Sequence, residues 1–285
     1  MKKSSKADLF LLGLAFIWGA TFGLVKNALN DISPLVFNSV RFTLASILFW
    51  IIFRDKLGSF EKPLIKAGLL TGLFLALGYG FQTIGLYYTT ASKSAFITGF
   101  SVILVPLFII IIEKIIPKPT VIFSAFLALI GLRLLTMSGS NGGINIGDLL
   151  TVMCAAAYAL HLICIEIFTK KYDYIKLSFL QLIMTAILNL LAIPIFETPR
   201  FNFTLTVFWT LLITSIFCSA FAIYILNRVQ RYTTAAHAAI IFTMEPVFAY
   251  LIAYLFYGEK LGIIGTIGAG LILMGMILSE LKRAK

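Results

Sequence analysis

The chain has 285 residues, of which 60% are hydrophobic and only 12% are charged, and its formal net charge is +11. An ordinary soluble domain is about 45–50% apolar and about 25% charged, so no soluble fold could bury this much apolar surface. A helix needs about 20 apolar residues to cross the hydrocarbon layer of a membrane, and the sequence predicts an all-α integral membrane protein built from such helices.

Ten apolar runs of this length follow one another, separated by short polar or Gly/Pro breaks. The first five cover residues 9–29, 33–53, 64–88, 91–112 and 120–138. The second five cover residues 146–169, 175–196, 204–227, 234–257 and 261–280. Basic residues precede the first run as in a signal peptide, but no small-residue cleavage site follows, so we expect this run to be the first spanning helix.

Lysine and arginine residues are segregated between the two sides of the membrane that ten spans define. With the N-terminus inside, seventeen lie on the inner side and four on the outer side. The inner ones are Lys2, Lys3, Lys6, Arg54, Lys56, Lys62, Lys66, Lys114, Lys118, Lys170, Lys171, Lys176, Arg228, Arg231, Lys282, Arg283 and Lys285; the outer ones are Lys26, Lys93, Arg200 and Lys260. Positive charge resists translocation, so both termini are predicted to be cytoplasmic. Topology thus accounts for the net charge, and a nucleic-acid partner is not expected.

The chain repeats itself, with predicted repeats at residues 1–140 and 141–285. A shift of 140 residues places Pro106 on Pro246, and a shift of 144 places the run at 88–91 (YTTA) on the identical run at 232–235. Five spans in each copy is an odd number, so the second copy is predicted to cross the membrane in the inverted orientation. Inverted repeats suit alternating access around a site near the bilayer midplane.

These residues resemble the EamA family of the drug/metabolite transporter superfamily. The resemblance rests on Trp18-Gly19, on the alanine-rich run Ala155 to Ala159, and on the passage from Thr233 through Glu245-Pro246 to Gly258-Glu259-Lys260-Leu261 and Gly275. It implies ten spans from two five-helix repeats and the carriage, usually export, of amino acids, purines, drugs or other metabolites. One departure is Val105, which stands where the second half has Glu245.

Arg41 and Glu245 are ionisable residues near the middle of apolar spans. Such a side chain costs about 2.5–3.5 kcal/mol on insertion scales, so we expect both to face protein or water. They could form a structural ion pair between the repeats or anchor a solute. Pro246 leaves the carbonyl of Phe242 without its donor and favours a kink, so this carbonyl and the Glu245 carboxylate could hold an ammonium group, a cation or a proton. Pro106 is expected to bend the fourth span at the matching place.

Polar and aromatic residues recur at helical spacing on several spans and predict a central cavity. The predicted substrate-binding residues are Trp18, Asn38, Arg41, Tyr79, Gln82, Tyr158, His161, Gln181, Tyr224 and Glu245. The alternative for each is an interhelical hydrogen bond, which contributes about 0.6 kcal/mol on average. His161 could carry a proton near neutral pH or could simply be packed. The sequence assigns no role to Arg133.

The expected function is secondary transport, and by resemblance export, of a small polar metabolite such as an amino acid across a prokaryotic plasma membrane. Alternating access would move the solute, and protons are the candidate coupling ion. A multidrug or cationic-compound exporter and a passive channel remain alternatives. No nucleotide-binding loop or catalytic constellation is present, so neither a primary pump nor an enzyme is expected. Cys154, Cys164 and Cys218 all lie inside spans, so we expect no disulfide, metal or cofactor, in either a monomer or a homodimer.

Overall fold

The computed structural model describes residues 3–114, 119–137 and 145–281. The described chain is helical, apart from an isolated bridge between Ile32 and Phe201. In chain order the elements are α1 (Lys3–Ala28), α2 (Pro34–Leu57), α3 (Lys62–Tyr88), α4 (Ala91–Gly99), α5 (Ser101–Glu113), α6 (Pro119–Met137), α7 (Ile146–Thr169), α8 (Tyr174–Phe196), α9 (Leu205–Ile213), the π-helix η1 (Thr214–Phe221), α10 (Ala222–Gln230), α11 (Ala235–Phe242), α12 (Met244–Tyr257) and α13 (Gly262–Leu281).

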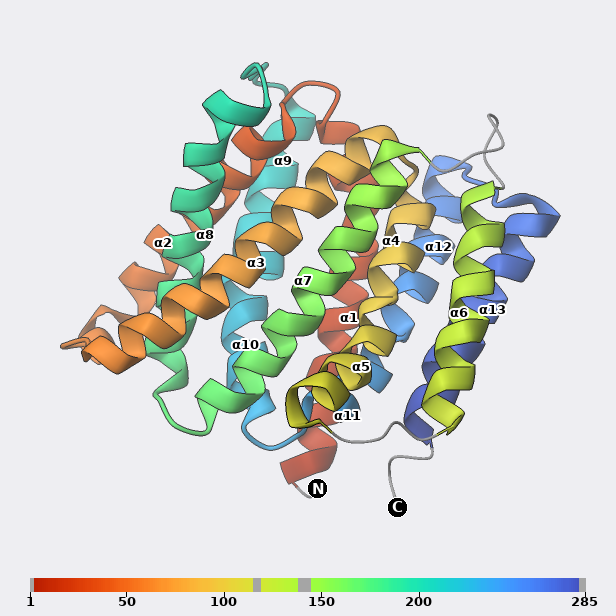
Figure 1. Cartoon of the computed structure of the whole chain (residues 1–285). Helices are drawn as coiled ribbons and strands as arrows, with labels where there is room; N and C mark the ends of the chain where they lie inside the picture. Colours follow the sequence, from red (N-terminus) through yellow and green to blue (C-terminus); the bar gives the residue numbers. More distant parts are fainter. Residues whose placement is uncertain (1–2, 115–118, 138–144, 282–285) are drawn as a thin grey trace.

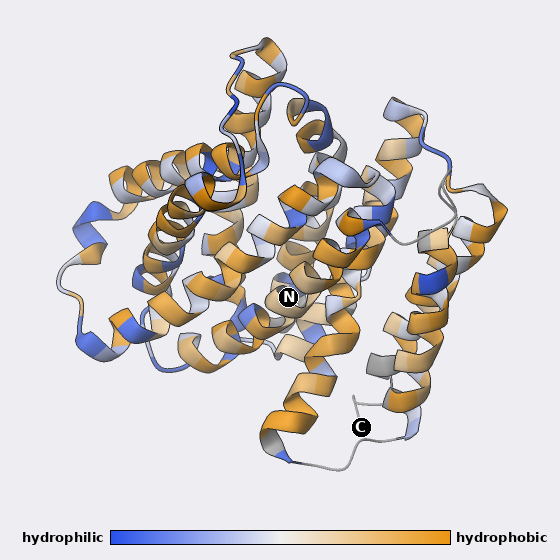
Figure 2. Ribbon diagram, turned by 45° about the horizontal axis from the view of Figure 1, so that its top comes forward, coloured by the Kyte–Doolittle hydropathy of each residue, from blue (hydrophilic) through white to orange (hydrophobic). Residues whose placement is uncertain are grey.

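These elements form ten apolar segments at the predicted places. Eight are long and apolar enough to cross a membrane, and two shorter apolar helices, Ile122–Leu135 and Gly262–Leu278, lie within α6 and α13. Hydrophobic residues run along the helices, and the hydrophilic ones gather toward their ends (Figure 2). The predicted repeat boundary at 140/141 lies outside the described residues, as do Lys2, Lys118, Lys282, Arg283 and Lys285.

The two halves of the chain run in opposite directions. In Figure 1, α1 rises from the edge where both chain ends lie, whereas α7, the first helix of the second half, begins at the opposite edge and descends. The connections between α7 and α8 and between α10 and α11 lie at the edge of the chain ends. This arrangement is the one expected when an odd number of spans separates two similar halves.

The fourth and ninth spans are broken at corresponding places. α4 and α5 meet at Phe100, and α11 and α12 meet at Thr243. Pro246 cannot donate to the carbonyl of Phe242, and α11 ends at that residue. Pro106 lies inside α5, after the break rather than at it. The two breaks therefore differ in their distance from the proline.

The eighth span contains a π-helix. Residues Thr214–Phe221 adopt this geometry between two α-helical segments, α9 and α10. π-Helical turns within α-helices are rare and frequently lie at functional sites, because they leave carbonyls turned away from the ordinary ladder. This segment faces α2, and it supplies the partners of several cavity side chains described below.

Glycines hold α6 and α13 close together at one side of the bundle (Figure 1). A Cβ atom added at Gly131 would lie 2.6 Å from the carbonyl oxygen of Gly268, and one added at Gly268 would lie 2.6 Å from that of Gly131. On α3, Gly68 and Gly72 similarly admit Leu180 and Met184 of α8. Small residues at such contacts let helices approach closely in a membrane, where water does not drive them together.

Candidate functional site

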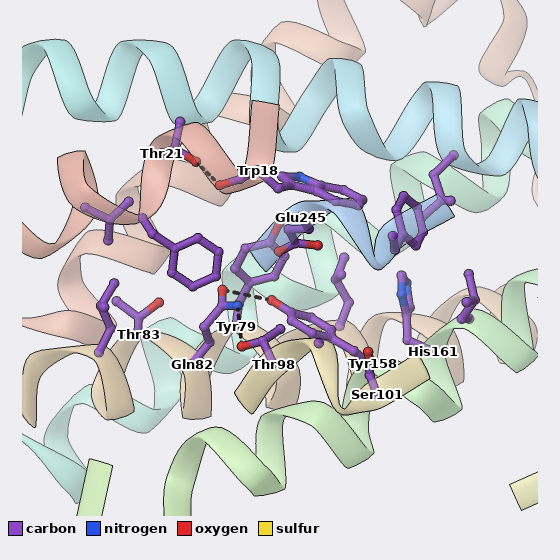
Figure 3. A pocket seen from close by; sticks show the side chains of 18 of the residues that line it. Trp18, Thr21, Tyr79, Gln82, Thr83, Thr98, Ser101, Tyr158, His161 and Glu245 are labelled. Carbon is purple, nitrogen blue, oxygen red and sulfur yellow. Dashed lines mark hydrogen bonds between the residues drawn. The ribbon is translucent and has the colours of Figure 1, made fainter. Parts of the chain in front are cut away.

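A cavity lies between the two halves of the molecule. It contains about 920 Å³ of space not filled by protein, including its open part. Its lining comes from α1, α2, α3, α4, α5, α7, α10, α11 and α12, so both repeats contribute. The polar and aromatic lining residues are Trp18, Thr21, Phe22, Arg41, Tyr79, Gln82, Thr83, Thr98, Ser101, Tyr158, His161, Phe242 and Glu245. Figure 3 shows most of these side chains.

Glu245 brings an unpaired carboxylate to this cavity. It lies on the first turn of α12, directly after the break at Thr243, and its side chain points into the cavity below Trp18 (Figure 3). Among the described residues, no hydrogen bond or ion pair engages the carboxylate. Gly19 lets α1 cross here, because a Cβ atom at that position would lie 2.6 Å from the carbonyl oxygen of Glu245. Close helix packing thus fixes the backbone that carries the acid.

Arg41 lines the same cavity but is held by neutral partners. Its side chain is 4% exposed. Nε donates to Ser219 Oγ at 2.7 Å, and Nη2 donates to Tyr79 Oη at 3.4 Å. The guanidinium carbon lies 4.6 Å from the centroid of the Tyr79 ring and 5.3 Å from that of Phe42, within the range of cation–π contacts. Arg41 and Glu245 therefore share a cavity without forming an ion pair.

The π-helix orients two aromatic residues of the cavity through one carbonyl. The oxygen of Cys218 accepts a hydrogen bond from Trp18 Nε1 at 3.0 Å and another from Tyr79 Oη at 3.4 Å. The neighbouring Ser219 is the Arg41 partner described above. The eighth span therefore anchors side chains from the first three spans, and the geometry of η1 accounts for their placement.

A second polar chain links the repeats across the cavity. Tyr158 of α7 donates through Oη to Gln82 Oε1 at 3.2 Å, and Gln82 Nε2 donates to Thr98 Oγ1 at 3.2 Å (Figure 3). Gly78 makes room for Tyr158, since a Cβ atom there would lie 2.3 Å from its ring. These contacts fix the two tyrosine rings edge to face, with the centroids of Tyr79 and Tyr158 5.5 Å apart.

Seven of the ten sequence-predicted residues line the cavity: Trp18, Arg41, Tyr79, Gln82, Tyr158, His161 and Glu245. Three do not. Asn38 is fully buried and donates to the carbonyl of Tyr79 at 3.0 Å. Gln181 lies behind His161 and contacts its Nε2 at 2.8 Å. Tyr224 stacks on Phe53 with centroids 4.9 Å apart.

Four polar lining residues were not among the predicted ten: Thr21, Thr83, Thr98 and Ser101. Small hydroxyl residues recur throughout these spans, and many bond the carbonyl four residues earlier on their own helix, as Thr21 does with Ile17. The sequence therefore carries a signal for them, the shared face with Trp18 and Gln82, but that signal does not separate a cavity residue from a packed one.

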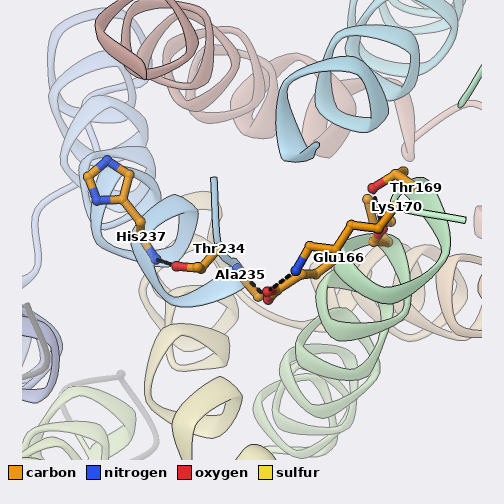
Figure 4. Close-up of polar contacts among 7 residues, drawn as sticks. Glu166, Thr169, Lys170, Thr234, Ala235 and His237 are labelled. Carbon is orange, nitrogen blue, oxygen red and sulfur yellow. Dashed lines mark hydrogen bonds and ion pairs between the residues drawn. The ribbon is translucent and has the colours of Figure 1, made fainter. Parts of the chain in front are cut away.

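Carboxylates cap the broken spans at opposite edges of the molecule. At the start of α4, Glu259 accepts from the backbone nitrogens of Ala91 and Ser92 at 3.1 and 3.0 Å. At the start of α11, Glu166 accepts from the backbone nitrogen of Ala235 at 2.7 Å and from Lys170 at 2.9 Å (Figure 4). A carboxylate is stabilising at a helix N-terminus because the unpaired N–H groups and the helix dipole favour negative charge.

Paired contacts accompany these caps. Asp148 at the start of α7 accepts from Thr89, just before α4, at 2.8 Å. Asp8 near the start of α1 contacts His237 of α11 at 2.9 Å. Asp8 and Asp148 are equivalent under the shift of 140 residues. In each repeat, an acid on the first helix therefore contacts a residue near the start of the fourth span of the other repeat.

Comparison with known proteins agrees with this architecture. The profile of the EamA-like transporter family matches residues 5–137 and again residues 145–281. A protein of Archaeoglobus fulgidus named "uncharacterized transporter" is 36% identical over 97% of this chain and 86% of its own length. An S-adenosylmethionine/S-adenosylhomocysteine transporter of Chlamydia muridarum is 36% identical over 33% of this chain and 30% of its own length. A solved crystal structure with 16% identity matches the fold with a TM-score of 0.70, over 98% of this chain and 99% of that one.

Two matches of one transporter profile, one in each half, agree with the repeated spans. The chain therefore belongs to the EamA-like transporter family and is a multi-pass membrane transporter rather than an enzyme.

Proposed function

We propose that the protein is a secondary carrier that exports a small polar metabolite, such as an amino acid, by alternating access. The observation that carries this proposal is the unpaired Glu245 carboxylate, which shares a cavity with Arg41 between inverted halves. One acid and one base in an aromatic cavity suit a zwitterion, because each charged end of the solute then meets an opposite charge.

The proposed binding residues are the seven predicted ones that line the cavity, and the other three act from behind them. Asn38 positions α3 at Tyr79, and Gln181 positions the ring of His161. Tyr224 packs in an aromatic cluster with Phe53 and Tyr174. The solute would contact Trp18, Tyr79 and Tyr158, whose rings can enclose its apolar part.

Alternating access is supported by two carboxylate caps, one at each edge of the molecule. Glu259 caps the N-terminus of α4 and Glu166 caps that of α11, so the equivalent spans are capped at opposite edges. A carrier has to open one edge while the other is closed, and two similar half-structures can exchange their open and closed conformations. The breaks at Phe100 and Thr243 provide places where each span can bend.

The orientation proposed for the chain has both termini in the cytoplasm of a prokaryotic cell. The support is the bias of lysine and arginine toward the edge that carries both chain ends, since positive loops stay on the cytoplasmic side. The solute class is supported in part by the relative from Chlamydia muridarum, because both solutes in its name contain an amino-acid group.

A multidrug exporter remains the alternative that one observation favours, the large aromatic share of the cavity lining. A thermal-shift screen of amino acids, nucleobases and cationic drugs on detergent-purified protein would find ligands, and counterflow in liposomes would test the hits. We expect saturable counterflow with at least one small polar metabolite. Transport that rises linearly with concentration would indicate a channel, and failure of every compound to bind or cross would contradict the proposal.

A further inference from the structure

A buried chain of hydrogen bonds lies behind the cavity, and the chemistry of its groups determines which atom donates and which accepts at each contact. Its end is the backbone carbonyl of Ile223, which can only accept, so Asn227 must turn Nδ2 toward it, at 2.8 Å. Asn227 Oδ1 then faces Gln181, whose Nε2 donates to it at 3.1 Å. Gln181 Oε1 is left facing His161 Nε2, at 2.8 Å. Both amides are fully buried, so water cannot replace these partners.

The chain therefore determines which nitrogen of His161 carries hydrogen. Reversing the amide of Gln181 would set its oxygen against Asn227 Oδ1, two acceptors facing each other, and reversing both amides would set Asn227 Oδ1 against a carbonyl. Nε2 of His161 is thus the donor. In the neutral ring, which burial favours, Nδ1 then keeps a lone pair and can only accept.

Nδ1 of His161 has no partner among the described residues, although the side chain is 4% exposed and lines the cavity. The ring reaches from α7 into the cavity, as Glu245 does from α12 (Figure 3). The Glu245 carboxylate is also unpaired. The cavity thus contains two side chains with acceptor atoms that no described residue engages.

Most of the donors that line the cavity are, by contrast, engaged with the protein. Trp18 donates to a backbone carbonyl, and Tyr158 and Gln82 donate along their own chain. Thr83 donates to Asn38 at 3.2 Å. Arg41 donates through Nε and Nη2 to Ser219 and Tyr79, as described above. Because neither the Glu245 carboxylate nor Nδ1 of His161 has a donor among the described residues, a solute that satisfies both must bring donors to them.

We propose that Glu245 and His161 together bind a protonated primary or secondary amine of the transported solute. The ammonium charge meets the carboxylate, and N–H groups satisfy both the carboxylate and Nδ1 of His161. Quaternary ammonium compounds, which have charge but no N–H, are excluded because they would leave Nδ1 of His161 unsatisfied. This inference rests on the proposed carrier function and deepens it by naming the chemical group that the solute must have.

The tautomer can be tested without any solute. The chain has two histidines, so protein labelled with ¹⁵N-histidine gives the signals of two rings, and the His237→Gln variant assigns them. We expect Nε2 of His161 to be protonated and Nδ1 to have the shift of a nitrogen with a free lone pair. A ring of His161 protonated only on Nδ1 would overturn the proposal.

The ligand class is tested with a matched series of probes. Leucine, leucinamide, phenethylamine, the trimethylammonium counterparts of leucine and phenethylamine, and 4-methylpentanoate differ in their N–H groups and charges. We expect the free amines to bind and the trimethylammonium compounds to bind at least about tenfold more weakly, since they lack the N–H donors. We expect 4-methylpentanoate, which has no amine, to show no binding. Equal binding of amines and trimethylammonium compounds, or no binding of any amine, would overturn the proposal.

Variants then connect the ligand to the two residues. Glu245→Gln and His161→Phe should each weaken amine binding by about tenfold or more, the loss expected for a hydrogen bond to a charged group. Glu61→Gln, an exposed acid at the start of α3, should bind as the parent does. Unchanged binding in Glu245→Gln would overturn the proposal. If another solute shows saturable counterflow while amines do not bind, the amine site fails and the carrier function stands.

Discussion

At the scale of single residues, the main distinction is between the two ionisable groups of the cavity. Arg41 lies against two aromatic rings and donates to Ser219 and Tyr79, whereas Glu245 has no such partner among the described residues. An ionisable group within a membrane span that lacks a protein partner is costly, and proteins keep such groups mainly where function needs them. Replacing Glu245 should therefore change transport while leaving the fold intact.

Replacing Glu245 with glutamine should remove any dependence of transport on a pH gradient. Glutamine keeps the shape and an acceptor oxygen but cannot take up or release a proton. The measurement is uptake of a labelled hit into liposomes with and without a pH gradient. Glu61→Gln serves as the control, and a Glu245→Gln variant that still responds to the gradient would exclude this acid as the coupling site.

Replacing Arg41 with lysine should lower stability by about 1.5–3 kcal/mol, although the charge is kept. Lysine lacks the planar guanidinium that donates to Ser219 and stacks on Tyr79. Thermal unfolding in detergent would measure the loss. The same change at the exposed Arg54 should stay within about 0.5 kcal/mol of the parent, and equal effects at both positions would contradict the role of the cavity contacts.

The sequence identified the cavity residues that differ most from lipid-facing ones. Arg41, Glu245 and His161 could be selected because an ionisable group in a span needs a polar environment. Gln181 and Tyr224 share helical faces with other polar residues, but spacing along one helix cannot say whether that face meets the cavity or a neighbouring helix. Thr98 could not be separated from other threonines because its role depends on Gln82, sixteen residues earlier.

At the scale of elements, the broken spans four and nine and their caps are the features that most need explanation. The caps are not equivalent in sequence: Glu259 follows α12, whereas Glu166 belongs to the end of α7. Under the shift of 140 residues Glu166 corresponds to Lys26, which donates to the carbonyls of Leu86 and Tyr87 instead. The two repeats thus use different side chains at corresponding places, a lysine that donates to carbonyls in one and a carboxylate that accepts from a backbone nitrogen in the other.

Removing either cap should bias the carrier in opposite directions. Losing about 1–2 kcal/mol at one helix N-terminus shifts a two-state equilibrium by roughly five- to thirtyfold. With Thr98→Cys as the only cysteine, labelling by an impermeant reagent from the edge where α11 begins should rise in Glu166→Ala and fall in Glu259→Ala. Changes of the same sign in both variants would show that these carboxylates do not govern opposite edges.

The break at Thr243 was foreseeable from Pro246, but the break at Phe100 and the π-helix were not. A proline removes a specific hydrogen bond, so its effect can be placed on one carbonyl. The residues of η1 contain no proline or glycine, and the segment packs against α2 and accepts hydrogen bonds from Trp18 and Tyr79. Contacts between residues far apart in the sequence produce no signal in the local sequence.

At the scale of the whole molecule, ten spans and their opposed halves followed directly from the sequence. Length and composition fix the number of apolar helices, and an odd number in each half fixes their relative direction. How the helices pack depends on residues far apart in the sequence, and glycines lie at the closest contacts. Gly68 and Gly72 meet α8, and Gly268 and Gly275 meet α6.

Gly268→Leu should destabilise the protein, whereas Gly270→Leu on the same helix should not. A Cβ atom at Gly268 would collide with the backbone of α6, while one at Gly270 would meet nothing within 4 Å. We expect a loss of about 1–3 kcal/mol for the first change and a neutral or favourable effect for the second. Thermal unfolding of the two variants measures this, and equal losses would argue against tight packing of α6 on α13.

Fusion reporters should place both ends of the chain in the cytoplasm. A fluorescent protein at the C-terminus should fluoresce, since it folds inside the cell, and an alkaline phosphatase inserted in the connection between α8 and α9 should be active outside it. The reverse pattern would invert the proposed orientation while leaving the architecture intact.

The wide turn of the eighth span makes that helix sensitive to its length as well as to its side chains. A π-helical turn takes up one residue more than an α-helical turn while the helix beyond it keeps its phase, so deleting one residue from Thr214–Phe221 would restore ordinary winding. The carbonyl of Cys218 and the hydroxyl of Ser219 would then lose the positions in which they accept from Trp18, Tyr79 and Arg41. One residue in this segment thus decides whether the eighth span presents these acceptors to the site.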